Sequence, residues 1–412
     1  MSNSLFVSGL LGLGTVGKGV MVSWFKNRRA LRQRARLDIR LGIILVRTLC
    51  GQDSKLVRCC FTANIKHLLS DPRLPILVEV LGGTNVARRL AHSTTQKKKR
   101  LVTANKTLLA CYNFEVGAQI ERFLIEAAVG GGMPIINVIR RDLVINQLGL
   151  ISGIINGTTN WLLSETAKSL MPLRRLLFEA VRRGYAEQDS SSDVDGADSA
   201  QKINILSAQS SGSYHKIRCI RASGIRYVRQ QDILFGKELG FQTKLLSSFK
   251  MVGVEVCCLV QPTLVFKHLP FVLVGGTTNS ILLVGSNIGK VWLSGRGAGA
   301  LPTSSSVFAD FGSFESNNQY FRCPQMFCKR KQPLLYQHTA TLCNIHYFRT
   351  KKLRGWGDLF LLVGGMLAVG SVITIRPILN SSFLLVESGC TVGDVRAILK
   401  SRNYEVCWGG LV

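Results

Sequence analysis

The chain has 412 residues, and its 52 lysines and arginines outnumber its 24 acidic residues to give a formal net charge of +28. Its length allows two or three domains with their own cores, and its 46% hydrophobic content excludes a disordered polyelectrolyte. A charge of this size attracts nucleic acid or anionic lipid. However, basic runs such as "KKKR" at 97–100 lack the interleaved aromatic residues of a nucleic-acid surface. We therefore expect solvated basic faces and no nucleic-acid partner.

From residue 5, the stretch "LFVSGLLGLGTVGKGVMVSWF" predicts a strand, a glycine-rich turn and a helix. Further buried strands are predicted at 40–49, 76–83 and 99–106, with helical patterns between them. This alternation predicts an α/β fold with a Rossmann-type, doubly wound parallel sheet. Beyond about residue 140 the pattern of apolar segments and glycine turns predicts a mixed α+β domain. The polar stretch at 207–215 predicts a loop or a weakened helix end.

The first turn carries the spacing G-x-G-x-x-G at Gly12, Gly14 and Gly17. In a dinucleotide site the first glycine permits a tight turn, the second lets the backbone approach a pyrophosphate, and the third brings helix close to strand. We predict a cofactor site formed by Gly12, Leu13, Gly14, Thr15, Val16 and Gly17.

The second predicted strand ends at "LVRTL", where Arg47 replaces the acidic residue that usually binds the ribose hydroxyls. A guanidinium complements a 2′-phosphate, which favours NADP over NAD as the cofactor. A surface arginine without a ligand is the other reading of this residue.

Near the C-terminus an uncharged stretch of 17 residues at 359–375 is at the short limit for a membrane span. Its glycines and its Val/Ile-rich end fit a buried helix that leads into a strand, so we expect no membrane span. Twelve cysteines without framework spacing, and a start without a signal peptide, favour a reducing cytoplasm.

Seven blocks occur in the order and spacing of one known family: "GLGTVGKGV", "VEVLGGT", "RLVTANKTLLA", "EAAVGGGMPII", "GIINGTTNWLL", "GYAEQDSSSDVDGADSAQK" and "GRGAGALPTSSSV". From about residue 5 to 312 the chain resembles homoserine dehydrogenase. The tail resembles a degraded ACT regulatory domain. The resemblance implies a nucleotide-binding domain at 1–140 and a catalytic and dimerisation domain at 141–318, whose end returns to the first. A linker at 319–344 and an ACT-like unit at 345–412 would follow.

The implied activity is reversible hydride transfer between NAD(P) and the pair L-aspartate 4-semialdehyde and L-homoserine, in threonine, methionine and isoleucine biosynthesis. The aldehyde oxygen gains negative charge during reduction, so an ammonium beside it can stabilise that charge and deliver a proton. The family's proton donor matches Lys202, and its second essential lysine matches Lys106. Asp198 lies one helical turn before Lys202 and is expected to orient the ammonium or to bind a polar group of the substrate. Asp193 is expected to shape the turn or to cap the helix that presents Asp198. Glu187 matches the carboxylate that receives the substrate's ammonium.

The resemblance also implies a monovalent-cation loop, with sodium bound by oxygens of Glu126, Val129, Gly131 and Met133. It further implies cofactor contacts at Lys106, Gly184 and Gly299, and a homodimer or homotetramer. Two rival readings are an inactive relative that still binds NADP and a basic nucleic-acid-binding protein on the same scaffold.

Overall fold

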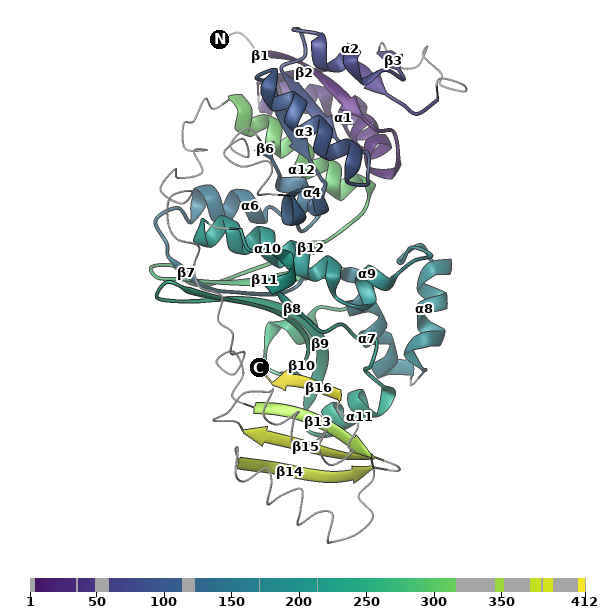
Figure 1. Cartoon of the computed structure of the whole chain (residues 1–412), viewed down its shortest axis with the longest axis vertical. Coiled ribbons are helices and arrows are strands. Elements are labelled where there is room, and N and C mark those ends of the chain that lie inside the picture. The colour runs from purple at the N-terminus through teal and green to yellow at the C-terminus, as the bar shows by residue number, and fades with distance from the viewer. Residues whose placement is uncertain are drawn as a thin grey trace.

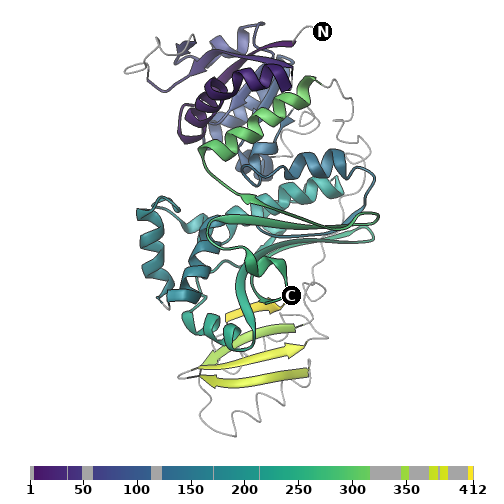
Figure 2. The ribbon, with the colours of Figure 1, turned by 180° about the vertical axis from the view of Figure 1, so that it is seen from behind.

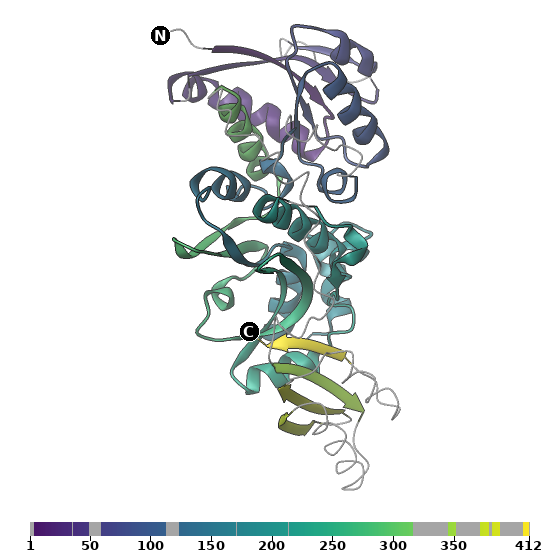
Figure 3. The ribbon, with the colours of Figure 1, turned by 60° about the vertical axis from the view of Figure 1, so that its left-hand side comes forward.

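The computed structural model describes residues 4–34, 36–48, 59–112, 123–169, 171–212 and 214–315, together with four strands of the C-terminal region. A first sheet with its helices forms one end of an elongated molecule, and a second sheet occupies the middle (Figure 1). The C-terminal strands lie at the opposite end (Figure 3).

The first sheet has six strands in the order β3-β2-β1-β4-β5-β6, and all neighbouring strands are parallel. Its strands are β1 (Ser4–Leu11), β2 (Leu37–Leu45), β3 (Cys60–Thr62), β4 (Ile76–Glu79), β5 (Arg100–Thr103) and β6 (Phe123–Leu124). The predicted parallel sheet is confirmed, although the two short edge strands β3 and β6 were not foreseen. The strand order reverses at β1, and open α/β sheets bind ligands at the carboxyl ends of the strands beside such a reversal.

Helices cover both faces of this sheet: α1 (Thr15–Arg34), α2 (Ile65–Ser70), α3 (Asn85–Gln96), α4 (Lys106–Cys111) and α12 (Ala300–Glu315). On one face α1 and α12 lie side by side (Figure 2). They pack on strand residues such as Leu10 and Ile44 through Val20, Val307 and Phe311. The other face is packed by α2, α3 and α4. The chain therefore returns to its first sheet at residues 300–315.

The described part of the second sheet before residue 300 is mainly antiparallel, in the order β12-β11-β7-β9-β10. Its strands are β7 (Leu148–Ile154), β9 (Phe241–Val252), β10 (Glu255–Phe266), β11 (Thr278–Gly285) and β12 (Gly289–Arg296), with β8 (Arg221–Ala222) beside β10. The connecting elements are η2 (Glu126–Ala128), α6 (Ile135–Asn137), η3 (Val138–Asp142), α7 (Gly157–Ser169), α8 (Leu173–Arg182), α9 (Ser191–Val194), α10 (Ala197–Ser211), η4 (Ile217–Cys219), α11 (Gln230–Glu238) and η5 (Pro270–Leu273).

Helix α10 lies between the two sheets (Figure 1) and ends at Ser211, within the stretch 207–215 for which we predicted a loop or a weakened helix end. The helix end does lie in this stretch, and the helix reaches Ser211 because the serines donate their hydroxyl protons to carbonyls of the same helix. Ser207 donates to the Asn204 carbonyl at 3.0 Å, and Ser211 donates to the Ser207 carbonyl at 2.8 Å. Buried hydroxyls with such partners cost little, so polar composition did not end the helix.

The C-terminal strands are β13 (Ile345–Lys351), β14 (Ser371–Ile378), β15 (Ser381–Glu387) and β16 (Cys407–Leu411). They follow one another across the sheet in the order β16-β13-β15-β14, and β16 continues the second sheet by pairing in parallel with β10. The linker predicted at 319–344 and any helices of an ACT-like unit lie outside the described residues. The last part of the uncharged stretch, 371–375, belongs to β14, and 359–370 is not described. Among the helices that the structure describes, none combines the length and the apolar character that a membrane crossing requires.

Candidate active site

The glycine turn after β1 has the geometry of a dinucleotide site. Gly12 has φ +104°, and a Cβ atom there would lie 2.8 Å from the Val80 carbonyl oxygen. A Cβ atom on Gly17 would lie 2.1 Å from the Gly12 carbonyl oxygen, so this glycine brings α1 against the turn. By contrast, a Cβ atom on Gly14 would meet nothing within 4 Å. The open side of the turn, at the N-terminus of α1, thus fits a pyrophosphate.

Four other predicted cofactor residues lie in this turn or just after β2. Thr15 begins α1 and is exposed, while Leu13 and Val16 are half-buried. Arg47 is exposed two residues after β2 ends, at the carboxyl edge where a ribose would lie in this strand order. Its position is therefore compatible with binding a 2′-phosphate.

Lys106 is placed by a polar network at the carboxyl ends of β4 and β5. The buried Glu79 carboxylate accepts the Thr103 hydroxyl at 2.5 Å, and the same hydroxyl oxygen accepts the Asn105 backbone N–H at 3.0 Å. The Asn105 side chain caps α4 by accepting the Leu108 N–H at 3.0 Å. Since α4 begins at Lys106, these bonds fix where the lysine leaves the first sheet.

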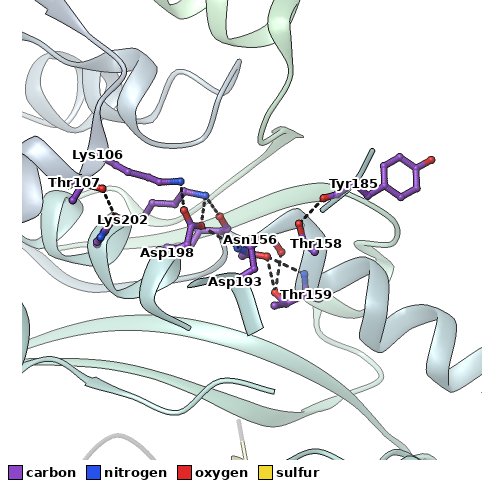
Figure 4. Close-up of polar contacts among 11 residues, drawn as sticks. Lys106, Thr107, Asn156, Thr158, Thr159, Tyr185, Asp193, Asp198 and Lys202 are labelled. Carbon is purple, nitrogen blue, oxygen red and sulfur yellow. Dashed lines mark hydrogen bonds and ion pairs between the residues drawn. The ribbon is translucent and has the colours of Figure 1, made fainter. Parts of the chain in front are cut away.

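Asp198 joins the two predicted lysines, as Figure 4 shows. Its Oδ2 lies 2.7 Å from Lys202 Nζ, and its Oδ1 forms an ion pair with Lys106. The Lys202 ammonium also donates to the Ile155 carbonyl at 2.8 Å. The side chains of Asp198, Lys202 and Lys106 are 3%, 11% and 39% exposed. The structure thus brings both lysines to one buried carboxylate, and Lys106 is the more accessible of the two.

The charges in this cluster hold one another ionised. Burial by itself would raise the pKa of Asp198, but the ammonium groups of Lys202 and Lys106 outweigh it and lower that pKa. Burial would lower the pKa of Lys106, yet the carboxylates of Asp198, Asp193 and Glu187 outweigh it and raise that pKa. The site is therefore an ion cluster in which proton affinity depends on the number of nearby carboxylates.

Glu187 lies in the connection that follows α8, where it is exposed. Its carboxylate is one of three that raise the pKa of Lys106, so the charge of Glu187 acts on the ion cluster while its side chain remains exposed. Gly184 has φ +71° just beyond α8, and a Cβ atom on it would meet nothing within 4 Å. A glycine is favoured here because the backbone is left-handed at the end of a helix. Close contact with other atoms is not the reason, because a Cβ atom would meet none.

The segment proposed to bind sodium follows β6 and packs against the connection from β12 to α12. A Cβ atom on Gly131 would lie 2.5 Å from the Gly297 carbonyl carbon, so close backbone contact requires this glycine. The Gly131 carbonyl accepts the Ser306 hydroxyl at 2.5 Å, and the Met133 carbonyl accepts the Ile135 N–H at 2.8 Å. Gly299, two residues beyond Gly297, has φ +119°, which a glycine adopts without strain.

The acidic member of this loop is held by protein groups. The Glu126 carboxylate accepts backbone N–H groups of Ile136 at 3.1 Å and Asn137 at 2.6 Å. Burial raises its pKa to about 7. Val129, another predicted ligand, is fully buried. In the described part of the chain no three His, Cys, Asp or Glu side chains group as metal ligands, so only backbone oxygens could form most of the predicted coordination.

Sequence reasoning missed Asn156 and misread Asp193. Asn156 caps α7 and contacts both Asp193 and Asp198, although an asparagine directly before "GTTN" is a recognisable helix-cap signal. Asp193 was expected to shape a turn or cap a helix. Instead its side chain accepts the Asn156 amide, and α10 follows the left-handed Gly196 without a side-chain cap.

The strand order and the glycine turn place the chain among proteins that bind a dinucleotide cofactor, and two lysines on one carboxylate suit an oxidoreductase that acts on a carbonyl or hydroxyl group. The family model for homoserine dehydrogenase matches residues 134–311, and that for the NAD-binding domain of homoserine dehydrogenase matches residues 12–121.

Individual proteins give the same result. A homoserine dehydrogenase of Synechocystis is 38% identical over 73% of this chain and 71% of its own length. One of Bacillus subtilis is 32% identical over 75% and 72%, respectively. The crystal structure of a homoserine dehydrogenase from Thiobacillus denitrificans superposes with a TM-score of 0.88 at 29% identity, and covers 100% of this chain and 99% of that one. The chain belongs to the homoserine dehydrogenase family of oxidoreductases, with an NAD(P)-binding domain.

Proposed function

We propose that this protein reduces L-aspartate 4-semialdehyde reversibly to L-homoserine with NAD(P), as a step in the synthesis of threonine, methionine and isoleucine. The observation that carries the proposal is the convergence of Lys106 and Lys202 on Asp198, beside the carboxyl end of β5. The nicotinamide, when bound, supplies or accepts the hydride. Side chains of the protein transfer the proton, stabilise the developing charge and bind the substrate.

In the direction of reduction, Lys202 is the proton donor. Its ammonium stabilises the negative charge that develops on the aldehyde oxygen and delivers a proton to that oxygen. Lys106, which is more exposed, supplies a second positive charge at the carboxyl end of the first sheet. Asp198 holds both ammonium groups in place, and Glu187 receives the ammonium of the amino acid. In the reverse direction, Lys202 accepts the proton of the homoserine hydroxyl.

The glycine turn of residues 12–17 would hold the pyrophosphate of the cofactor, with Gly299 and Gly184 as further contacts. Arg47 would favour NADP over NAD, because its exposed guanidinium at the end of β2 complements a 2′-phosphate. We infer NADP as the preferred cofactor on this ground.

Three further features belong to this proposal. Sodium would be held at the loop of Glu126, Val129, Gly131 and Met133. The positive φ of Gly131 supports this, because it re-aims backbone carbonyls, which keep a second lone pair besides the hydrogen bonds described. The protein would form a homodimer or homotetramer through its second domain and act in the cytoplasm. The C-terminal strands would belong to an ACT-like regulatory unit.

The decisive assay follows the absorbance of reduced cofactor while homoserine is oxidised with NADP or NAD. We expect homoserine-dependent reduction of the cofactor, with NADP preferred. In Lys202→Ala, turnover should fall at least about 100-fold while the affinity for cofactor stays within about twofold of the wild type. Lys237→Ala, which removes an exposed lysine of α11, is the matched control and should retain full activity.

Two results would contradict the proposal. Normal turnover in Lys202→Ala would exclude this lysine as the proton donor. Binding of NADP without homoserine-dependent turnover in the wild-type protein would identify an inactive relative.

A further inference from the structure

Asn156 is a buried amide that joins two carboxylates of the site. It lies between β7 and α7 and is 4% exposed. Its Nδ2 donates to Asp193 Oδ1 at 2.6 Å and to Asp198 Oδ2 at 3.0 Å. Its Oδ1 accepts two hydrogen bonds from Thr159, from the backbone N–H at 2.9 Å and from the hydroxyl at 3.0 Å. Both amide hydrogens and both oxygen lone pairs are thus engaged (Figure 4).

These partners leave only one orientation of the amide. Rotation by half a turn would aim the Asn156 oxygen at two carboxylates and its NH2 group at the Thr159 N–H, which has no lone pair to offer. The Thr159 contacts therefore commit both donors of the amide to the acidic side chains. As a result, Asp198 Oδ2 is held by Asn156 and Lys202 together, and Oδ1 is left facing Lys106.

We propose that Asn156 and Asp193 are positioning residues for proton transfer: the amide fixes Asp198 with one oxygen on each lysine, and Asp193 supplies the second negative charge that balances two ammonium groups. The inference rests on the proposed function, because it concerns the lysines assigned to that reaction. Asp193 is not itself placed on the substrate or the cofactor.

The charges support this role. Two ammonium groups against Asp198 alone would leave a partly buried site with one uncompensated positive charge, which a low-dielectric environment disfavours. The groups that face Lys106 are Asp198 from α10, Asp193 from α9 and Glu187 from the connection after α8, and all three raise its pKa. Burial and the charge of Asp198 raise the pKa of Asp193, while Asn156 and the two lysines oppose that increase. Asp193 therefore favours the charged form of Lys106.

Asp195 offers a matched control two residues away. Its carboxylate also has a strong partner, because Arg226 donates to it at 2.6 and 2.7 Å. However, both side chains are about half exposed, and Asp195 is not among the groups that affect the pKa of Lys106. Asp193→Asn and Asp195→Asn thus remove the same charge from neighbouring positions, only one of which faces the lysines.

The test measures the pKa of Lys106 directly in the full-length protein. The side chain of Lys106 is 39% exposed, so acetic anhydride can reach it, and its rate of labelling at a series of pH values reports the fraction of neutral amine. Mass spectrometry of the peptide that contains Lys106 gives the rate. We expect Asp193→Asn to lower the apparent pKa by about one pH unit, and Asp195→Asn to leave it unchanged. Asp193→Ser should shift it in the same direction.

The pH profile of homoserine oxidation provides a second readout. The rising limb should move to lower pH in Asp193→Asn and stay in place in Asp195→Asn, because only Asp193 shares the Asn156 amide with Asp198, the carboxylate on which both lysines converge. In Asn156→Ala, kcat should fall at least about tenfold while the Kd for NADP is retained. A residue with a merely structural role would change the thermal midpoint without moving either pH dependence.

The outcomes separate this inference from the proposed function. Equal Lys106 pKa values in Asp193→Asn and Asp195→Asn would overturn the inference even in a fully active enzyme. If Asp193→Asn lowers the pKa of Lys106 as expected but the wild-type protein does not oxidise homoserine, the role of Asn156 and Asp193 is supported and the proposed function is overturned.

Discussion

Asp198→Asn tests the ion cluster, because it removes the one carboxylate that both lysines share. The substitution keeps the volume of the side chain, so it leaves two ammonium groups without their common partner rather than a cavity. Lys202, 11% exposed, keeps only the Ile155 carbonyl, whereas Lys106, 39% exposed, can turn toward water. Removing one partner of a buried ion pair costs about 3 to 5 kcal/mol. We expect a loss of about 3 kcal/mol in the free energy of unfolding at pH 7.

Urea unfolding of both proteins at several pH values measures this loss. Because the pKa of Asp198 is lowered in the folded state, its contribution is fully present above its ordinary pKa of 3.8 and disappears as the pH falls through the lower folded value. The difference between wild type and Asp198→Asn should therefore stay constant from pH 7 to 5 and narrow only in strong acid. Asp195→Asn, which breaks an exposed pair, should cost less than about 1 kcal/mol. A cost as small for Asp198→Asn would refute the shared-carboxylate argument.

The glycine turn, the second strand end and the second sheet give three more predictions. Gly17→Ala should lower the thermal midpoint, because its Cβ would lie 2.1 Å from the Gly12 carbonyl oxygen. Gly14→Ala, whose Cβ would meet nothing within 4 Å, should keep the midpoint and weaken NADP binding. Equal thermal midpoints for the two variants would contradict this expectation. Arg47→Asp should weaken binding of NADP relative to NAD by about tenfold or more, and an unchanged ratio of the two Kd values would exclude its role. Burial lowers the pKa of Lys244 from 10.5 to about 8, so the unfolded chain binds this proton more tightly than the folded protein does. The free energy of unfolding should therefore rise by about 3 kcal/mol between pH 8 and 10.5. In Lys244→Met the free energy of unfolding should rise less over this pH range. Identical pH dependences in the two proteins would show that burial does not lower the pKa of Lys244.

Local sequence was sufficient to predict the four longer strands of the first sheet and half of the ion cluster. Alternating apolar runs and glycines identify β1 and α1, because strand, turn and helix are set by neighbouring residues. Asp198 and Lys202 are four positions apart, and a helix places such residues on one face. The short strands β3 and β6 escaped prediction because two or three residues carry no periodicity. The polar stretch at the end of α10 left open whether a loop or a helix end lies there, because serines can find hydrogen-bond partners within a helix.

The rest of the site depends on contacts between distant segments. Lys106 meets Asp198 only because α4, at the edge of the first sheet, packs near α10, and Asn156 contacts Asp198 across 42 positions of the chain. No local spacing encodes such a meeting, since it requires two sheets and their helices to pack together. The sequence by itself determined which side chains carry charge and which turns accept a dinucleotide. Tertiary structure decided which charges share a carboxylate, because burial of two apolar cores brings those segments together.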